Sequence, residues 1–311
     1  MAPCTLIITL VILLGLARLS LGDDQRELDA MQAPPAELQY HGGAVLHGDI
    51  PVSVVWYGSF TPEQKAIVVD FVESLTSKPP ASTSTPSVAL WWSTIDRIYL
   101  SNATAGGGGA TRVLLAGEVA DETYSLGKSL TLAQVSQLAA GAAPKKGTVV
   151  LVLTDPDVVV EGFCSVRCGL HGADAGAGYA YAWAGDASQQ CPGQCAWPFA
   201  RPSYGPQDKP LGAPNGDVGV DGAMVTLAGM LAGAVTNTYG DAYYQGEKDA
   251  GLEACTACAG VYGSGSFPGY AGHVLVDEAT GGSYNANSAG GHKYLLPAVY
   301  DPAKPGCSTL V

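Results

Sequence analysis

The sequence has little positive charge. Its 311 residues include 15 Lys and Arg against 28 Asp and Glu, and the formal net charge is −13. Nucleic acids and anionic membranes attract proteins through clusters of Lys and Arg. The composition therefore argues against a nucleic-acid partner and against an anionic membrane surface as a partner.

Recognisable catalytic motifs are also missing. No Gly-x-Ser-x-Gly sequence marks a serine nucleophile. A catalytic zinc ion needs three protein ligands, but no two histidines have His-x-x-x-His spacing. The five histidines stand singly, at His41, His47, His171, His273 and His292. We therefore expect no catalytic residue, no metal and no cofactor. A distributed metal site that uses His171 and Asp217 is the alternative.

The N-terminus has the features of a secretory signal peptide. Residues 6–16 are almost wholly apolar but too few to span a bilayer comfortably. Ser20 and Gly22 supply small residues at positions −3 and −1 of a cleavage site before Asp23. We predict a signal peptide over residues 1–22 and a mobile polar segment over 23–39, with an uncleaved signal anchor as the alternative. We predict no membrane span in the mature chain, which is expected outside the cell.

The stretch 215–239 predicts a buried helix at the centre of the fold. A Gly/Asp loop precedes the helix and places Asp221 as the expected N-cap. The helix has no charged side chain, which is typical of a buried helix. Gly229 and Gly233 each weaken a helix by about 1 kcal/mol relative to Ala. Apolar residues recur with helical spacing at Met224, Leu227, Ala228, Leu231 and Val235.

Helical patterns alternate with apolar strand patterns along the rest of the chain. Helices are predicted from Thr61, as the N-cap before Pro62, and over 87–98 and 131–142. Strands are predicted over 45–57, as a hairpin or two short strands, and over 111–115, 147–153 and 273–277. This alternation predicts a single-domain, layered α/β sandwich with a mixed sheet and the central helix buried. A Cys/Gly-rich region over 163–195 is expected to be stapled by disulfides.

Seven cysteines remain once Cys4 is removed with the predicted signal peptide. In a secreted protein they are expected to form disulfides, and a zinc site is the alternative. Two Cys-x-x-x-Cys pairs could bond within or between themselves, and the odd number leaves one thiol over. Asn102-Ala-Thr is an N-glycosylation sequon beside a run of four glycines at 106–109, so we predict a glycan on Asn102.

Short motifs in a fixed order carry a family resemblance. They include 215–222 (Asn-Gly-Asp-Val-Gly-Val-Asp-Gly), 40–43 (Tyr-His-Gly-Gly), 55–58 (Val-Trp-Tyr-Gly) and 260–263 (Gly-Val-Tyr-Gly). With these motifs the chain resembles the Exordium-like, or phosphate-induced, secreted proteins of plants. The resemblance extends along most of the mature chain and implies an Exordium-like domain over residues 40–311.

The resemblance also implies roles for individual residues. It suggests a His-Glu-x-x-Glu-like pattern on the central helix, with the three positions occupied here by Gly229, Met230 and Gly233. None of these side chains suits hydrolytic zinc, so we predict a degenerate site without catalysis. The resemblance suggests Cys255 as the unpaired thiol. The remaining disulfide candidates are Cys164, Cys168, Cys191, Cys195, Cys258 and Cys307.

The resemblance implies a protein of the apoplast or cell wall that takes part in growth regulation and in hormone and nutrient responses, and we predict from the three helix positions that it is non-catalytic. Its extracellular or cell-wall partner is unknown. One alternative is a metal-dependent hydrolase that acts on wall or peptide substrates, and another is a carbohydrate-binding cell-wall protein. Five tryptophans could stack on sugars, although Trp at strand and helix positions more often belongs to a core. They are Trp56, Trp91, Trp92, Trp183 and Trp197.

Overall fold

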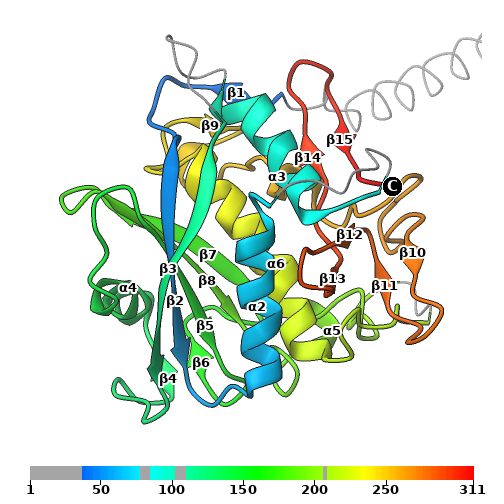
Figure 1. Ribbon diagram of the computed structural model, residues 1–311, viewed down its shortest axis with the longest axis horizontal. Coiled ribbons are helices and arrows are strands. Elements are labelled where there is room, and N and C mark those ends of the chain that lie inside the picture. The colour runs from blue at the N-terminus through cyan, green and yellow to red at the C-terminus, as the bar shows by residue number, and fades with distance from the viewer. Residues whose placement is uncertain (1–36, 78–84, 102–109, 206–208) are drawn as a thin grey trace, which may run out of the picture. The chain divides into compact units, whose positions relative to one another are not determined.

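The chain folds around a five-stranded mixed sheet, seen in a computed structural model that describes residues 37–77, 85–101, 110–205 and 209–311 (Figure 1). Strands β2 (Asp49–Tyr57), β3 (Arg112–Asp121), β5 (Val149–Thr154) and β8 (Tyr179–Gly185) are parallel, and β7 (Gly169–Asp174) is antiparallel to β8. Their order in the sheet is β3-β2-β5-β8-β7. The predicted single-domain α/β class with a mixed sheet is confirmed.

Alternating side chains of the central strands supply two separate cores. In β2, Val54 and Trp56 point into the larger core, whereas Val55 and Tyr57 belong to the smaller one on the opposite face. Successive side chains of a strand point to opposite faces of a sheet. A strand that is apolar at every position is therefore covered on both sides. All six residues of β5 are buried, as this arrangement requires.

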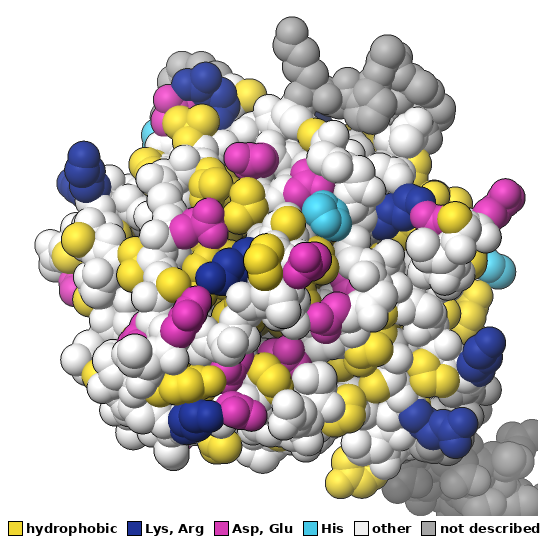
Figure 2. All heavy atoms as spheres, turned by 60° about the horizontal axis from the view of Figure 1, so that its bottom comes forward, with side chains coloured by type: hydrophobic (Ala, Val, Ile, Leu, Met, Phe, Trp, Pro, Cys, Tyr) yellow, Lys and Arg dark blue, Asp and Glu magenta, His cyan; other side chains and the backbone are white. Residues whose placement is uncertain are grey.

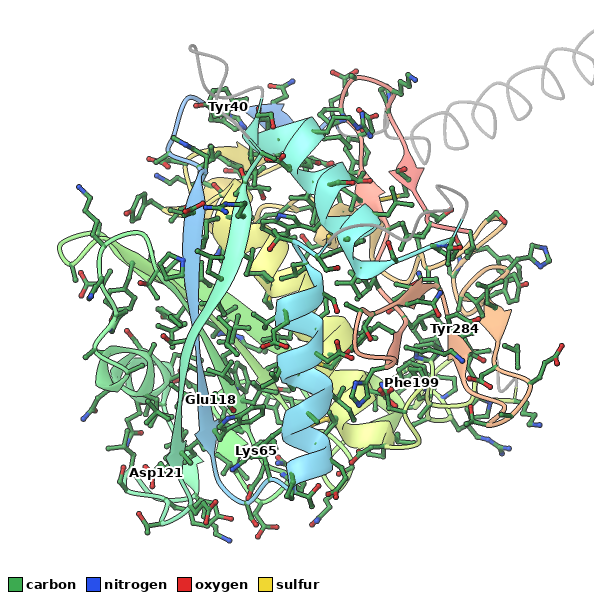
Figure 3. The ribbon with its side chains drawn as sticks, in the orientation of Figure 1. Tyr40, Lys65, Glu118, Asp121, Phe199 and Tyr284 are labelled. Atoms are coloured by element: carbon green, nitrogen blue, oxygen red, sulfur yellow. A yellow bond between two sulfur atoms is a disulfide. The ribbon has the colours of Figure 1, made fainter. Side chains whose placement is uncertain are left out.

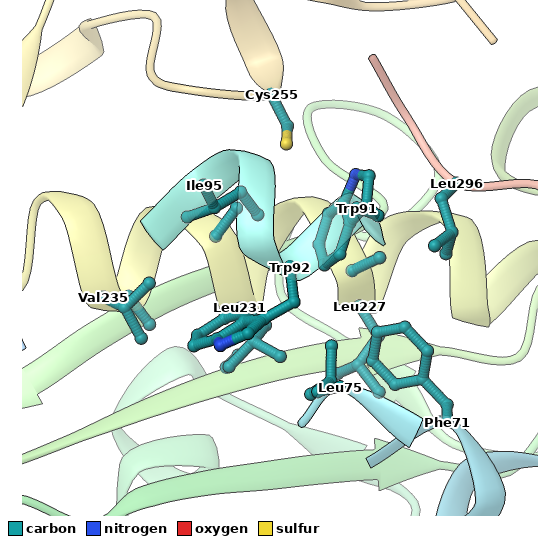
Figure 4. Packing of buried hydrophobic residues seen from close by; sticks show 14 of the residues in the cluster. Phe71, Leu75, Trp91, Trp92, Ile95, Leu227, Leu231, Val235, Cys255 and Leu296 are labelled. Atoms are coloured by element: carbon teal, nitrogen blue, oxygen red, sulfur yellow. The ribbon is translucent and has the colours of Figure 1, made fainter. Parts of the chain in front are cut away.

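Helices cover both faces. The larger core packs α2 (Pro62–Ser74), α3 (Val88–Ile95) and α6 (Val218–Thr236) against the sheet, and α4 (Leu132–Gly141) covers the other face. Figure 4 shows Trp91 and Trp92 of α3 lying close to Leu227 and Leu231 of α6. The predicted N-cap Thr61 is confirmed, because its side chain accepts a hydrogen bond from the first turn of α2. The Ser87 and Thr131 side chains cap α3 and α4 in the same way.

Shorter elements surround the sheet. A π-helical turn, Asp96–Leu100, continues α3, and α5 (Pro192–Cys195) and two 3₁₀ turns (Lys248–Ala250, Thr256–Cys258) are single turns. Paired short strands are β1 (Gln39–Tyr40) with β9 (Tyr243–Tyr244), β4 (Ser129–Leu130) with β6 (Val159–Val160), β10 (Leu275–Val276) with β11 (Ser283–Tyr284), β12 (Ala286–Asn287) with β13 (Lys293–Tyr294), and β14 (Val299–Tyr300) with β15 (Cys307–Ser308).

The central helix α6 is buried as predicted, but its N-cap is Asp217 and not Asp221. The Asp217 side chain accepts a hydrogen bond from the backbone N–H of Val220, and Asp221 lies in the first turn, where it holds Asn215. Among the described residues, α6 is the one helix that is long and apolar enough to cross a membrane by length and composition. Since 78% of that window is buried inside the protein, α6 is the core helix of the fold.

Two strand predictions were wrong in extent. Residues 49–57 form one nine-residue strand and not a hairpin. Pro51 is tolerated because β5 pairs with β2 only from Val52 onward, so one side of Pro51 needs no N–H donor. Strand β3 runs to Asp121, well past the predicted end at residue 115. Most of its later residues are exposed, so the apolar pattern that marks a strand is absent there.

The ordered body begins slightly earlier than the predicted boundary at residue 40. Residues Leu38–Val311 form one compact unit. Leu38 is 1% exposed, and Gln39 pairs with Tyr244 in the β1–β9 ladder, so both belong to the fold and not to a mobile segment. The predicted signal peptide, the glycosylation site at Asn102 and the glycine run at 106–109 lie outside the described residues.

Candidate functional site

The three helix positions of the predicted degenerate site lie on α6 against other side chains. A Cβ added at Gly229 would lie 3.8 Å from the Cβ of Cys255, an ordinary contact. The Cγ atom of Met230 lies 3.3 Å from where a Cβ would stand on Gly169 of β7. Gly233 faces His171 and Glu253, and an added Cβ would overlap the Glu253 carboxylate. Glycine is thus needed at Gly233 for close approach.

His171 and Glu253 form a pair over Gly233. The His171 Nε2 and Glu253 Oε2 atoms are 2.7 Å apart, and both side chains are largely buried. The Asn237 amide donates to Glu253 Oε1 at 2.6 Å, and Asn237 itself ends α6. The Nδ1 atom of His171 is buried and has no hydrogen-bond partner within the described residues. This pair therefore closes the end of α6, and one imidazole nitrogen is left without a partner.

His171 and Asp217 bond to different partners, so their contacts do not place them in one site. His171 bonds to Glu253, whereas Asp217 caps α6 and accepts a hydrogen bond from the Gln64 amide at 2.8 Å. Within the described ranges, no group of three His, Cys, Asp or Glu residues is arranged to hold a metal ion.

Acidic residues follow the parallel strands at their carboxyl ends, where open α/β sheets usually bind ligands. Asp155 follows β5 and accepts hydrogen bonds from the Ser59 N–H and the Tyr124 hydroxyl. Asp186 follows β8, and burial raises its pKa above the usual carboxyl value. Figure 3 shows Asp121, Glu118 and Lys65 at the same end, and Figure 2 shows acidic side chains spread over this face. The hydrogen bonds of Asp155 thus hold the loops that carry Ser59 and Tyr124.

A hollow of about 310 Å³, which we call the polar hollow, lies beside α2 and the Gly/Asp loop. Its polar lining residues are Glu63, Asn215, Asp277, Thr280, His292 and Lys293. The Lys293 ammonium pairs with Asp277 and lies 4.9 Å from the centre of the Tyr284 ring. The hollow therefore carries charges of both signs.

Two buried aspartates support the polar hollow from behind. Asp70 accepts from His292 Nδ1 at 2.6 Å and from the Ser288 hydroxyl at 2.6 Å. Burial raises the pKa of Asp70, but these and two backbone hydrogen bonds outweigh it, and the pKa lies below the usual carboxyl value. Asp221 accepts from the backbone and side-chain amide of Asn215, and burial raises its pKa to about 6. His292 and Asn215 are thus held in fixed orientations.

An open groove of about 720 Å³ lies between the α5 region and the loop 259–269. We call it the aromatic groove. Tyr204 is 83% exposed and Phe267 61% exposed, and Trp197 lies between them and a second hollow of about 240 Å³. The two hollows share Trp197, Pro202 and Gly269. Exposed apolar patches mark interaction surfaces or ligand-binding grooves.

Disulfides anchor both walls of the aromatic groove. Cys164–Cys191 and Cys168–Cys195 flank α5 on one side, and Cys258–Cys307 precedes the opposite wall. The two Cys-x-x-x-Cys pairs therefore bond between themselves, which settles an alternative that spacing left open. Cys255 is the free cysteine of the described residues and is buried. The six disulfide candidates thus form the three disulfides, and Cys255 is the cysteine left over.

The tryptophans divide as their positions suggest. Trp56, Trp91, Trp92 and Trp183 are buried in the two main cores, and only Trp197 reaches a surface groove. Neither Tyr204 nor Phe267 was among the predicted site residues. The available signal was local: Phe-Pro-Gly-Tyr at 267–270 is a turn sequence with Pro and Gly at its centre. The structure places Gly269 at φ 92° in that turn, with the N–H of Tyr270 bonded to the carbonyl of Phe267.

Fold and sites together define a disulfide-bonded α/β protein with an open aromatic groove and a separate polar hollow. The sequence profile of the family described as "Phosphate-induced protein 1 conserved region" matches residues 38–310. The chain therefore belongs to the Exordium-like, phosphate-induced family. The profile covers the sheet, α6, the polar hollow, the aromatic groove and all three disulfides, so these features lie inside the family domain.

Three relatives show the extent of the similarity. The chain is 52% identical over 296 residues to Protein PHOSPHATE-INDUCED 1 of Nicotiana tabacum, with 92% of this chain and 93% of that protein covered. It is 51% identical to Protein EXORDIUM-like 1 and 50% identical to Protein EXORDIUM, both of Arabidopsis thaliana, with 88% of this chain and 89% of each protein covered. No solved structure matches the chain.

Proposed function

We propose that the protein is a secreted, non-catalytic member of the Exordium-like family that acts in the apoplast or cell wall. The packing against α6 carries the non-catalytic part of this proposal. Gly229 faces Cys255, Gly233 leaves room for no larger residue, and Met230 contacts the strand β7. A zinc-bound water needs neutral or anionic ligands and a base, and these three positions supply neither.

Three disulfides support an extracellular location, because disulfides persist in oxidising compartments and are rare in the cytosol. The proposed signal peptide over residues 1–22 and the proposed glycan on Asn102 follow the same logic. We also propose, from family membership, a part in growth regulation and in hormone and nutrient responses through an extracellular or cell-wall partner. The proposal includes neither a nucleic-acid partner nor a membrane span in the mature chain.

Expression in a secretory plant host tests the location. We expect N-terminal sequencing of the secreted protein to begin at or near Asp23, and glycosidase treatment to increase its electrophoretic mobility. Asn102→Gln should remove that shift. An intact Met1 terminus, or retention of the protein inside the cell, would contradict secretion.

Metal analysis of the same preparation tests the non-catalytic part. We expect less than stoichiometric zinc after dialysis and no hydrolysis of wall polysaccharides or peptides. Tight, stoichiometric zinc together with activity that chelators abolish would overturn the proposal and favour a metal-dependent hydrolase.

The polar hollow favours one second candidate, a hydrolase that uses His292 as a base. Because Asp70 stays ionised and accepts from Nδ1, the proton of neutral His292 lies on Nδ1 and the lone pair on Nε2. An imidazole oriented by a carboxylate in this way is a common general base. If the protein hydrolyses a wall substrate, His292→Asn should abolish the activity, whereas activity that survives this change would exclude His292 as its base.

A further inference from the structure

We propose that the aromatic groove binds a neutral polysaccharide chain. This inference goes beyond the proposed function, because it assigns a site and a ligand class that do not depend on where the protein acts. It is carried by exposed aromatic rings, by the lack of charge in the groove and by the length of the combined hollow.

Exposed aromatic side chains are the first observation. Tyr204 and Phe267 leave 83% and 61% of their surface in contact with solvent, although rings of this size contribute most when buried. Phe267 is supported on one side by Tyr270, with ring centres 5.1 Å apart, and Trp197 rests against Tyr262 at 5.9 Å. Phe267 and Trp197 are therefore each held by a neighbouring ring, and both line the groove. The face of an aromatic ring carries partial negative charge, so it can stack against the C–H groups on the apolar face of a sugar ring.

The charge of the groove is the second observation. Of the described residues that line it, none is Asp, Glu, Lys or Arg, although the whole chain has a net charge of −13. The adjoining hollow of about 240 Å³ has one charged lining residue among the described ones, Lys209. Protein partners are selected largely by complementary charges around an apolar centre, and acidic polysaccharides need basic groups. A groove without charge matches an uncharged ligand. The exposed Gln194 side chain and the Tyr204 hydroxyl offer hydrogen bonds to sugar hydroxyl groups.

The shape and rigidity of the groove are the third observation. It is open at the surface and continues past Trp197 into the hollow of about 240 Å³, so an extended chain fits it better than a small molecule. Its walls begin next to disulfides, at Cys195 on one side and Cys258 on the other. Walls fixed in advance lower the entropy that binding must overcome. The groove is thus preorganised for a long ligand.

Affinity electrophoresis of the purified full-length secreted protein tests the inference. The gels contain xyloglucan or hydroxyethyl cellulose as neutral probes, or polygalacturonate as an acidic probe. We expect both neutral polymers to retard the protein and polygalacturonate to leave its mobility unchanged. Phe267→Ala and Tyr204→Ala should each weaken retardation about tenfold, whereas Phe267→Tyr should preserve it. Tyr239→Ala removes an exposed ring elsewhere and serves as the matched control.

Several results would overturn the inference. They are no retardation of the wild-type protein by either neutral polymer, equal retardation by polygalacturonate, and retardation that both alanine variants retain. Binding of a proline-rich peptide that Phe267→Ala abolishes, without any polysaccharide binding, would also overturn it and identify a peptide groove instead. Melting temperatures equal to that of the wild type show that the variants are folded. Because the assay uses purified protein, it stays informative if the proposed location fails.

Discussion

The Nδ1 atom of His292 lies 2.6 Å from the Asp70 carboxylate, although 222 residues separate the two in sequence. Asp70 lies on α2 and also accepts hydrogen bonds from the Ser288 hydroxyl and the Gly290 N–H. One buried carboxylate therefore joins a helix of the N-terminal half to the loop 288–292 near the C-terminus. This connection fixes the wall of the polar hollow.

Asp70→Asn is expected to destabilise the protein by about 2 kcal/mol at neutral pH, because a buried hydrogen-bond network loses its charged acceptor. Burial opposes ionisation, but the hydrogen bonds dominate and hold the pKa of Asp70 below its usual value. The stabilisation is therefore complete above the unfolded-state pKa near 4 and is lost as pH falls through the lower folded-state pKa. Urea unfolding at a series of pH values measures it.

The control for this experiment is Glu73→Gln, an exposed position on the same helix. It should leave both the stability and its acid dependence unchanged. An Asp70→Asn variant that shows the same loss of stability below about pH 4 as the wild type would exclude Asp70 as the source of that loss.

Asp221 should have the opposite pH dependence. Burial raises its pKa to about 6 in the folded protein, so folding favours the protonated form. Its contribution is fully present below about pH 4 and is lost as pH rises through about 6, at a cost on the order of 3 kcal/mol. Asp221→Asn imitates the protonated carboxyl and should remove this part of the pH dependence. Unfolding free energies between pH 4 and 7 test it, with the exposed Glu278→Gln as control. A slope unchanged by Asp221→Asn would contradict the assignment.

The helix α6 and the aromatic groove show how much of the structure could be predicted from the sequence. The burial of α6 was predictable, because the helix has no charged side chain beyond its first turn, and such a helix is normally buried. Its N-cap was not, since both Asp217 and Asp221 can accept from a first turn and only the loop geometry decides. Phe267 and Tyr204 are more than 60 residues apart in the sequence. They line the same groove because disulfides and loops without a periodic pattern bring their segments together. Local patterns predict elements, whereas such sites depend on long-range contacts.

Cys255 should resist alkylation in the native protein. Its side chain is 3% exposed, and burial raises its pKa, so little reactive thiolate is available. Iodoacetamide without reductant is expected to label no cysteine in the native state and Cys255 alone in denaturant. Mass spectrometry of proteolytic peptides identifies the labelled residue. Labelling of Cys164, Cys168, Cys191 or Cys195 in denaturant would show that the disulfides flanking α5 do not form.

Gly229 and Gly233 stand one turn apart on α6 and should respond to alanine with opposite signs. At Gly229 the nearest side-chain atom would lie 3.8 Å from the new Cβ, so Gly229→Ala should stabilise the protein by about 0.5–1 kcal/mol through helix propensity. At Gly233 the new Cβ would overlap the Glu253 carboxylate and lie 2.6 Å from His171 Cδ2. Gly233→Ala should therefore destabilise it by about 2–4 kcal/mol.

The same contrast limits what can be rebuilt at the degenerate site. Gly229→His, Met230→Glu and Gly233→Glu together would recreate the implied ligand set, but the last change must displace the His171–Glu253 pair. We expect the triple variant to be unstable or to bind zinc with less than one equivalent, whereas Gly229→His with Met230→Glu should fold. Thermal unfolding and metal analysis of both variants test this. A stable triple variant with one tightly bound zinc ion would show that the space at Gly233 can open, and that packing alone does not prevent metal binding here.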